Sequence, residues 1–572
     1  MSGIFGLVDP SGADAGALVS AAGRASFRGR PLVEAAGPVA LGTYVREGQR
    51  PDVARDAAGL TVADGRVDAV SGLPNSEPAS ALLATILSTG GPEGLAEVAG
   101  DFAVARWDEQ RRHLVLSRDA FGLRPLVWAR RGRRLGFASD PEVLFALGLA
   151  SGELDRAAVA GYLALRDIAG ERTAFEKVRR ILGGRWLRVD LEGRRSEGRW
   201  FRPEDVAPAP RPAEEAAEAL ADALTTAATS RVRRRRVALS LSGGRDSGAV
   251  AVALAQGDVR STCVTQTFDP ELGCSEEEPA RRLAEAMGHR WLPAPVPVRI
   301  TDVHLSELPG VSGTPLGFPA FPQALSLRDA AVSAGAEVVL DGQGGEPLFS
   351  ASPLAVLDLL RRGRVKAAAA AARGFRQRWI YPYPVVAKVM LRALLPRPLL
   401  AVRERMRVAP PWVDGAIPAK ANPTGRTARA NLVSALIDAG RWPVAELWER
   451  LFARAGVEYS SPLLDARVVR LALSLPVELR VPVPTPKPLL ARALLDGFDA
   501  SRRKARFTQY YMRLAASARN DFPGLLGPRA LSAVRGYIRR DRLEALSDPR
   551  WVEAALPLLN VETWLLAAER GR

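Results

Sequence analysis

Two patterns of hydrophobic and polar positions follow one another along the chain. In the first, short apolar stretches alternate with turns that contain Gly and Asp, which is typical of neighbouring antiparallel strands. The strand-like stretches are residues 60–70, 102–108, 112–129 and 133–140. Two stretches with helical spacing, 79–87 and 156–163, interrupt them. This part of the chain therefore predicts a mixed α/β domain with much antiparallel sheet.

The second pattern follows a segment rich in Pro, Ala and acidic residues, Pro203–Pro212, which is typical of a linker. Beyond it, short apolar strands alternate with helices, and such alternation implies a parallel, doubly wound sheet. The strand-like stretches are 236–242, 261–268 and 336–340. After Ala351 the pattern is nearly all helical. We therefore predict two domains, residues 1–202 and 213–572.

Composition and cysteine content indicate a cytoplasmic protein. The chain has 572 residues, of which 47% are hydrophobic and 25% charged, values ordinary for a soluble globular protein. Two cysteines, Cys263 and Cys274, are too few to cross-link a chain of this size and fit a reducing compartment. The first residues lack the basic region of a signal peptide, and we find no apolar run long enough for a membrane span.

The net charge of +16 is concentrated in one segment. Residues Arg361–Arg407 hold 13 Lys and Arg but a single acid, Glu404. A solvated helical face explains this segment better than a nucleic-acid site, because no zinc-finger, RRM or other nucleic-acid motif accompanies it. A basic surface of this kind also suits an acidic peptide or a partner protein.

Histidine content limits the possible chemistry. The three histidines, His113, His289 and His304, show no spacing typical of metal ligands. The sequence therefore argues against a zinc site and against a Ser-His-Asp triad. Any bound metal is expected to be a hard cation held by carboxylates.

One short loop carries a clear chemical signal. The apolar stretch ending at Leu241 is followed by S-G-G-R-D-S, Ser242–Ser247, and then by a helical Ala/Val-rich stretch. A glycine-rich turn between a parallel strand and a helix directs backbone N–H groups at one point, which favours phosphate. The Walker pattern is absent. A carboxylate beside phosphates requires a cation between them, so Asp246 is predicted to bind Mg²⁺, although an ordinary helix N-cap is the alternative.

This loop resembles the pyrophosphate-binding loop of the ATP-pyrophosphatase superfamily, and its surroundings resemble the asparagine synthetase B-like proteins. Further matches in the expected order extend the resemblance over nearly the whole chain. They are Gly100–Asp108, Arg118–Trp128, Phe137–Asp140, the acidic helix Cys274–Gly288, Leu340–Phe349, Ala455–Asp465 and Lys487. The resemblance implies an amidotransferase-like (Ntn-type) α/β sandwich followed by an ATP-pyrophosphatase domain with a large helical region.

The same resemblance implies ATP and Mg²⁺ as cofactors and a set of site residues. The residues expected to bind ATP or pyrophosphate are Leu239, Ser240, Ser242, Gly243, Gly244, Asp246, Ser247, Gly342 and Gln343. Asp246 and Glu346 are the expected metal ligands, although the family usually has Asp where Glu346 stands. Lys487 is expected to stabilise negative charge during catalysis. Glu346 is expected to contribute to the same stabilisation through the metal that it binds. Glu458 is a candidate base, with a purely structural role as the favoured alternative.

The first domain departs from glutamine-hydrolysing members of the family. Residue 2 is Ser2 where these members have the cysteine nucleophile. Their N-G-E stretch appears as Asp64-Gly65-Arg66, so a cation replaces the acid expected to hold the glutamine amine. Their R-G-P-D stretch appears as Arg28-Gly29-Arg30-Pro31. We therefore predict a structural domain that does not hydrolyse glutamine.

Without ammonia, the attacking amine must belong to the substrate, as in β-lactam synthetases and lasso peptide cyclases. Gln343 stands where the former have a tyrosine that helps to deprotonate the amine. The basic helical insertion, Pro410–Val413 and residues 503–514 are more similar to lasso cyclases. The resemblance thus implies formation of a macrolactam in a peptide, with AMP and pyrophosphate released. Amide formation on a small molecule, as by β-lactam or asparagine synthetases, and an inactive basic scaffold for peptide or nucleic acid remain as alternatives.

The lasso resemblance also implies partners: a precursor core peptide, a leader peptidase and a leader-binding protein. The segment Arg361–Arg407 is expected to form a wall of the reaction chamber or to dock the peptidase. Neither a membrane nor a nucleic acid is expected as a partner.

Overall fold

The computed structural model describes most of the chain. The described residues are 3–70, 78–164, 170–315, 320–377, 391, 411–413, 426–437, 443–482, 485–495, 507–527, 529–547 and 555–570. Ser2, Pro410, residues 503–506 and most of the basic segment after Gln377 therefore lie outside the described residues.

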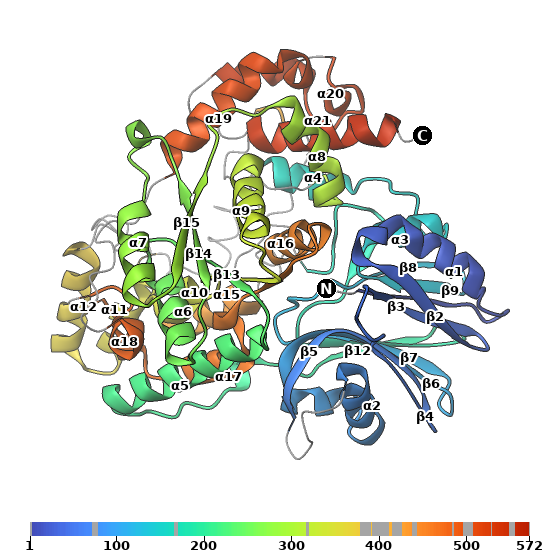
Figure 1. The fold of residues 1–572 in the computed structure, drawn as a ribbon, viewed down its shortest axis with the longest axis horizontal. Helices are drawn as coiled ribbons and strands as arrows, with labels where there is room; N and C mark the ends of the chain where they lie inside the picture. The colour runs from blue at the N-terminus through green and yellow to red at the C-terminus, as the bar shows by residue number, and fades with distance from the viewer. Residues whose placement is uncertain are drawn as a thin grey trace.

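The first domain contains two six-stranded antiparallel sheets (Figure 1). The order in one sheet is β10 (Arg179–Arg180), β8 (Val127–Arg131), β9 (Arg134–Ala138), β1 (Ile4–Val8), β3 (Val39–Val45) and β2 (Arg30–Ala36). The order in the other is β12 (Arg195–Arg199), β11 (Arg185–Asp190), β7 (His113–Arg118), β6 (Val98–Asp108), β5 (Gly59–Val70) and β4 (Val53–Asp56).

Alternation along the strands explains why these sheets stack. In β1, Ile4 and Val8 point into the core between the sheets, where they join Leu60 and Val62 of β5. The residues between them in β1, such as Phe5, face the opposite side. Successive residues of a strand point to opposite faces, and here both sets of residues are apolar. The other sheet buries one face of each sheet, so the opposite face needs a further layer. Helices supply it: α1 (Ala15–Ala22) and α3 (Pro141–Ala146) cover the first sheet, and α2 (Ala79–Thr89) covers the second.

The second domain is built on a five-stranded parallel sheet. Its order is β15 (Arg290–Pro295), β14 (Thr262–Thr267), β13 (Val237–Ser240), β16 (Val338–Leu340) and β17 (Glu458–Ser460). Leu239 and Leu340 pack on one face against α5 (Ala213–Val232), α6 (Arg245–Gln256), α17 (Ala466–Ser474) and α18 (Pro488–Leu494). Ala238 and Val339 pack on the other against α8 (Asp302–Ser312), α9 (Phe321–Ser333) and α16 (Pro443–Arg454). The predicted fold class, an antiparallel sandwich followed by a doubly wound parallel sheet, is confirmed.

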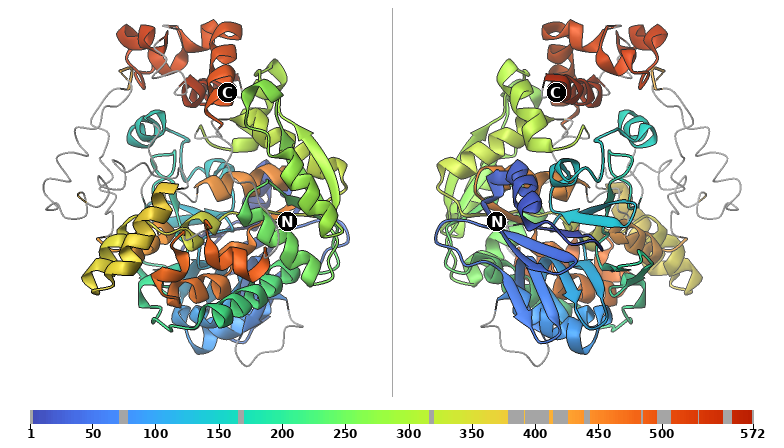
Figure 2. Two further views of the ribbon diagram at one scale, coloured as in Figure 1. Left: turned by 90° about the vertical axis from the view of Figure 1, so that its left-hand side faces the viewer. Right: turned by 90° about the vertical axis from the view of Figure 1, so that its right-hand side faces the viewer.

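The remaining helices extend this second domain. Near the sheet lie α7 (Glu277–Ala286), α10 (Gly345–Phe349), α11 (Leu354–Arg361), α12 (Val365–Gln377) and α15 (Ala428–Ile437). The last helices, α19 (Thr508–Asp521), α20 (Leu531–Val534) and α21 (Ala555–Arg570), gather at one end of the molecule with α4 (Arg156–Leu163) of the first domain beside them (Figure 2). No helix in the described part of the chain combines the length and apolarity needed to cross a bilayer.

Candidate functional site

The loop Ser242–Ser247 leaves the carboxyl end of β13 and enters α6. Hydrogen bonds within the loop fix its path: the Ser242 amide donates to Ser247 Oγ at 3.1 Å, and the Gly244 amide donates to Ser242 Oγ at 3.2 Å. Gly244 is the N-cap of α6 and Asp246 lies in the first turn, so Asp246 does not cap the helix. A Cβ at Gly243 would come within 2.7 Å of Pro279 Cγ, so glycine allows α7 to pack this closely.

A second glycine-rich loop lies against the first. It follows β16, which pairs in parallel with β13, so both loops emerge at the same edge of the sheet. A Cβ at Gly342 would lie 2.5 Å from the Ser247 amide nitrogen, and one at Gly345 would lie 2.2 Å from Asp246 Cγ. Both distances are far below van der Waals contact, so glycine lets the Gly342 backbone meet the Ser247 backbone and lets the Gly345 backbone meet the Asp246 side chain. Gly342 is among the predicted site residues and Gly345 is not, although the repeated glycines of D-G-Q-G-G-E were an available signal.

Lys487 joins the two loops. Its ammonium lies 2.5 Å from Asp246 Oδ2 and 2.9 Å from Glu346 Oε2, and its side chain is 11% exposed. Lys487 has a left-handed backbone conformation (φ +50°) at the N-cap of α18. The structure thus brings together three predicted site residues that are far apart in the sequence, on α6, α10 and the start of α18.

The arrangement fits a magnesium–nucleotide site. Within the described residues, no group of three or more His, Cys, Asp or Glu side chains could hold a metal by protein ligands alone. Mg²⁺ in nucleotide sites, however, commonly takes one or two carboxylates and completes its shell with phosphate oxygens and water. Asp246 and Glu346 converge on the Lys487 ammonium beside the loop Ser242–Ser247, whose hydroxyl groups and helix N-terminus are the kind of groups that bind phosphates. The residues present therefore fit Mg²⁺ and the phosphates of ATP.

The other predicted nucleotide-binding residues lie around these loops. The Leu239 side chain is fully buried in the core, so only its backbone can serve a ligand, and Ser240 ends β13 beside it. Gln343 donates its backbone amide to Asp341 Oδ1 at 3.1 Å. Asp341, which the sequence analysis missed, is 8% exposed and accepts a hydrogen bond from the Tyr459 hydroxyl. Burial raises the pKa of Asp341 to about 6.

Glu458 does not reach this site. It is the first residue of β17, in register with the first residue of β16, so it lies at the amino end of the sheet, whereas the loops leave the carboxyl end. Its carboxylate pairs with Arg124 of the first domain and with Arg235. Although burial opposes ionisation, these two guanidinium groups hold the pKa of Glu458 well below its usual range. The favoured structural role agrees with this placement.

Arg66, predicted to repel a glutamine amine, lies in a buried charge network between the domains. It is 5% exposed and pairs with Asp68 and, at 3.0 Å, with Asp101. Arg231 of α5, which is fully buried, reaches Asp101 at 2.9 Å and Asp465 at 2.8 Å. Charges from both domains are thus mutually neutralised where the sequence resemblance expected a substrate pocket.

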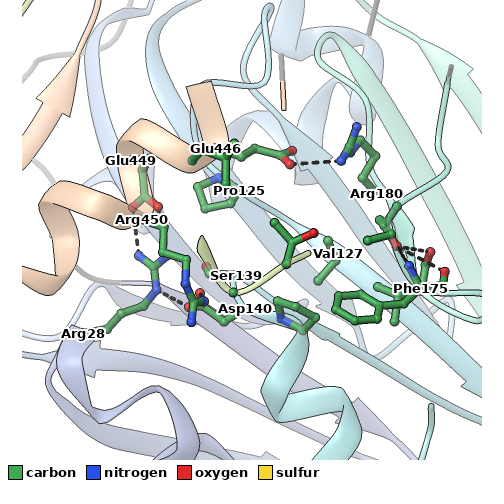
Figure 3. A pocket seen from close by; sticks show the side chains of 17 residues that line it. Arg28, Pro125, Val127, Ser139, Asp140, Phe175, Arg180, Glu446, Glu449 and Arg450 are labelled. Atoms are coloured by element: carbon green, nitrogen blue, oxygen red, sulfur yellow. Dashed lines mark hydrogen bonds and ion pairs between the residues drawn. The ribbon is translucent and has the colours of Figure 1, made fainter. Parts of the chain in front are cut away.

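Arg28 belongs to a second network of this kind (Figure 3). Its guanidinium pairs with Asp140 of its own domain and with Glu449 of α16, at 2.8 Å in the latter case. Arg450 pairs with Asp140 and, at 2.7 Å, with Glu142. A cavity of about 80 Å³ adjoins these ion pairs between the domains. Its charged lining is occupied by internal pairing, so it offers no evident charge for a ligand.

Fold and site define a class: an amidotransferase-like sandwich joined to a parallel-sheet domain with a glycine-rich loop between its central strand and the next helix. The family model described as "Asparagine synthase" matches residues 216–566, and the model described as "Glutamine amidotransferase domain" matches residues 75–201. The first of these covers more than half of the chain. The chain therefore belongs to the asparagine synthase family.

Curated relatives match part of the chain. Proteins named "Putative asparagine synthetase [glutamine-hydrolyzing]" from Mycobacterium bovis and Mycobacterium tuberculosis are 29% identical over 267 residues, 45% of this chain and 40% of theirs. "Amidase chyE" from Penicillium rubens is 27% identical over 302 residues, 46% of this chain and 42% of its own. The chain thus spans about two fifths of the length of the curated relatives it matches.

Among solved structures, a glutamine phosphoribosylpyrophosphate amidotransferase from B. subtilis matches with 13% identity and a TM-score of 0.26. The match covers 59% of this chain and 80% of the other. An overlap of this quality carries no argument about function.

Proposed function

We propose that this protein is an ATP-dependent, AMP-forming amide ligase. One observation carries the proposal: the Lys487 ammonium lies between Asp246 and Glu346, beside two glycine-rich loops at the carboxyl edge of a parallel sheet. Ligands of open α/β sheets bind at that edge. Membership of the asparagine synthase family supports the same activity.

The residues have distinct tasks in such a reaction. The Ser242–Ser247 loop would hold the β- and γ-phosphates through its hydroxyl and amide groups, and Asp246 with Glu346 would hold Mg²⁺. The cation, when bound, neutralises negative charge on the triphosphate. A substrate carboxylate oxygen attacks the α-phosphorus, the bond to the β-phosphate breaks, and pyrophosphate leaves. Lys487 would stabilise the charge that develops on the phosphate and later on the tetrahedral oxyanion.

Amide formation then requires an amine. Its nitrogen attacks the acyl carbon of the acyl-adenylate and loses a proton, and AMP departs. Holding amine and acyl group together supplies a large part of the rate without any strong base. The paired charges around Arg66 and Arg28 support an amine from the substrate, since they leave no evident charge to bind free glutamine.

The specific reaction we propose is closure of a macrolactam in a ribosomally made lasso peptide. The N-terminal amine of the core peptide would attack the activated side chain of an Asp or Glu. Support comes from Gln343 and from the resemblance of the basic insertion to lasso cyclases. A leader peptidase and a leader-binding protein would deliver the core peptide.

Reconstitution tests both levels of the proposal. The protein is combined with Mg²⁺, ATP, a lasso precursor peptide and a leader peptidase that cleaves it, and the products are analysed by mass spectrometry. We expect the core peptide to lose one water with one AMP formed per ring. A β-lactam or free asparagine as product would overturn the cyclase assignment but leave the ligase standing. Absence of any AMP would favour a binding scaffold.

A further inference from the structure

A small polar pocket adjoins the candidate site on the side of Glu346. It lies between α10, α15 and the turn η6 (Val477–Arg480), and its volume is about 150 Å³. Elements α10 and α15 lie side by side below the sheet (Figure 1). The polar residues that line the pocket are Glu346, Ser350, Ser352, Asn431 and Arg480.

Arg480 is the unusual member of this lining. It is 6% exposed, and burial together with nearby Arg429 lowers the pKa of its guanidinium to about 10. One Nη donates to the Leu475 carbonyl oxygen at 2.9 Å, but Nε has no hydrogen-bond partner. In the described part of the chain, no carboxylate forms an ion pair with Arg480. The acid two residues earlier, Glu478, pairs with Arg364 instead.

The positive charge around Arg480 is therefore only partly compensated, because Glu478 acts against Arg429 without forming an ion pair with Arg480. The one acid in its lining, Glu346, already pairs with Lys487 at 2.9 Å. A buried charge that no ion pair compensates is unfavourable, and an anion in the pocket would supply the ion-pair partner that Arg480 lacks. The hydroxyl groups of Ser350 and Ser352 and the amide of Asn431 add hydrogen-bond donors around such an anion.

Size restricts the anion. A cavity of about 150 Å³ holds a group the size of benzene, about six non-hydrogen atoms. The side chain of Asp or Glu fits this space, whereas a nucleotide does not. Because Glu346 borders both the pocket and the Asp246–Lys487 cluster, a carboxylate in the pocket would lie beside the place expected for the phosphates.

We propose that this pocket is the acyl subsite, which selects the carboxylate-bearing side chain of the substrate through the guanidinium of Arg480. The inference rests on the proposed ligase function and adds to it the pocket and the residue that would bind the acidic side chain. Arg480 is then a specificity-determining residue that acts on the acyl substrate and not on ATP.

A minimal probe tests the subsite with the full-length protein. N-acetyl-aspartamide carries one acidic side chain between blocked termini, and N-acetyl-asparaginamide is its neutral match. Titration calorimetry is expected to detect binding of N-acetyl-aspartamide and no binding of N-acetyl-asparaginamide. Arg480→Gln is expected to weaken binding of N-acetyl-aspartamide at least tenfold. Arg492→Gln, which changes a half-exposed arginine outside the pocket, is expected to bind the probe as the wild type does. The affinity for ATP should be unchanged in both variants.

Arg480→Met separates this role from a structural one. An apolar side chain needs no counter-charge, so this variant is expected to unfold at the wild-type temperature or above it while losing the probe. Equal probe binding by wild type and either Arg480 variant, or no binding by the wild type, would overturn the subsite. Probe binding that depends on Arg480 in a protein without ATP–pyrophosphate exchange would overturn the ligase function and leave the subsite in place.

Discussion

At the scale of single residues, the candidate site contains ion pairs whose partners would change when a nucleotide binds. Asp246 and Glu346 share the ammonium of Lys487, which is almost buried. Magnesium and phosphates together bring both signs of charge, so the cation can take the carboxylates while the phosphates take the lysine. The importance of each side chain can therefore be tested by removing its charge alone.

Asp246→Asn removes the charge expected to hold Mg²⁺ but keeps the side-chain shape. We expect ATP–pyrophosphate exchange to fall by about 100-fold or more, because charge stabilisation by a metal contributes several kcal/mol. The unfolding temperature should change little. Asp222→Asn, which alters an exposed aspartate on α5, is the matched control and should retain full exchange. Near-normal exchange by Asp246→Asn would rule out its role as a ligand.

Asp341 gives the protein a pH-dependent stability. Burial raises its pKa from 3.8 to about 6, so the folded protein binds the proton more tightly than the unfolded chain. This contribution is fully present below pH 4 and is lost as the pH rises through 6. Asp341→Asn should therefore gain stability relative to the wild type between pH 4 and 7, by at most about 3 kcal/mol. Urea denaturation at several pH values measures the difference, and a difference that stays constant with pH would contradict the prediction.

The first domain should not hydrolyse glutamine. Ser2 replaces the nucleophilic cysteine of the family, and Arg66 is paired with Asp101. Incubation with glutamine is expected to release no glutamate above the background of a protein-free sample. Turnover that disappears in Ser2→Ala would show instead that the serine acts as an N-terminal nucleophile.

At the scale of elements, the site depends on how closely α6 and α10 approach. Both helices begin directly after strands that are neighbours in the sheet, and glycines remove the side chains that would hold them apart. The candidate site is thus built from two strand–helix connections and not from the S-G-G-R-D-S stretch alone.

Gly345→Ala should separate these two elements. The added Cβ would lie 2.2 Å from Asp246 Cγ, so α10 or Asp246 must move, and Asp246 must shift relative to Lys487. We expect at least a tenfold loss of ATP–pyrophosphate exchange, since misplacement of about 1 Å can cost 100-fold. Gly524→Ala is the control, because a Cβ there meets nothing within 4 Å. Equal exchange by the two variants would show that the loops tolerate separation.

At the scale of the whole molecule, buried ion pairs hold the two domains together. Arg231 of α5 binds Asp101 of the first domain and Asp465 of the second, and Arg28 binds Glu449 across the same boundary. The linker also packs on the second domain, because the Ala209 amide donates to the Ser474 carbonyl oxygen at 2.9 Å. A relative motion of the domains would have to expose or separate these charges.

Arg231→Met should loosen this boundary. It leaves Asp101 and Asp465 buried without their shared partner, and breaking a buried pair typically costs about 3–5 kcal/mol. Urea denaturation measures the loss, and limited proteolysis of the linker reports separation of the domains. Arg194→Met, which removes an exposed partner of Asp190, should have little effect. Similar stability of both variants would mean that the network does not hold the domains.

The sequence by itself determined the two kinds of sheet and the position of the glycine-rich loop between strand and helix. Strand alternation, the strand–helix repeat and S-G-G-R-D-S are local patterns, and their meaning depends on residues within a few positions of each other. The expected partners Glu346 and Lys487 came from family resemblance, because no local pattern connects them to Asp246.

Only the tertiary structure decided which charges meet. The order of strands brings the loops after β13 and β16 to one edge with Lys487, and it leaves Glu458 at the opposite edge among arginines. In the sequence, Arg66 and Arg480 are each a single basic residue near a motif, and this pattern does not distinguish them. Arg66 is neutralised by Asp68 and Asp101, whereas Arg480 forms no ion pair with any carboxylate among the described residues and is only partly compensated by Glu478. Pairing of buried charges depends on contacts between distant segments, and such contacts exist only once the sheet order and the packing of the helices are set.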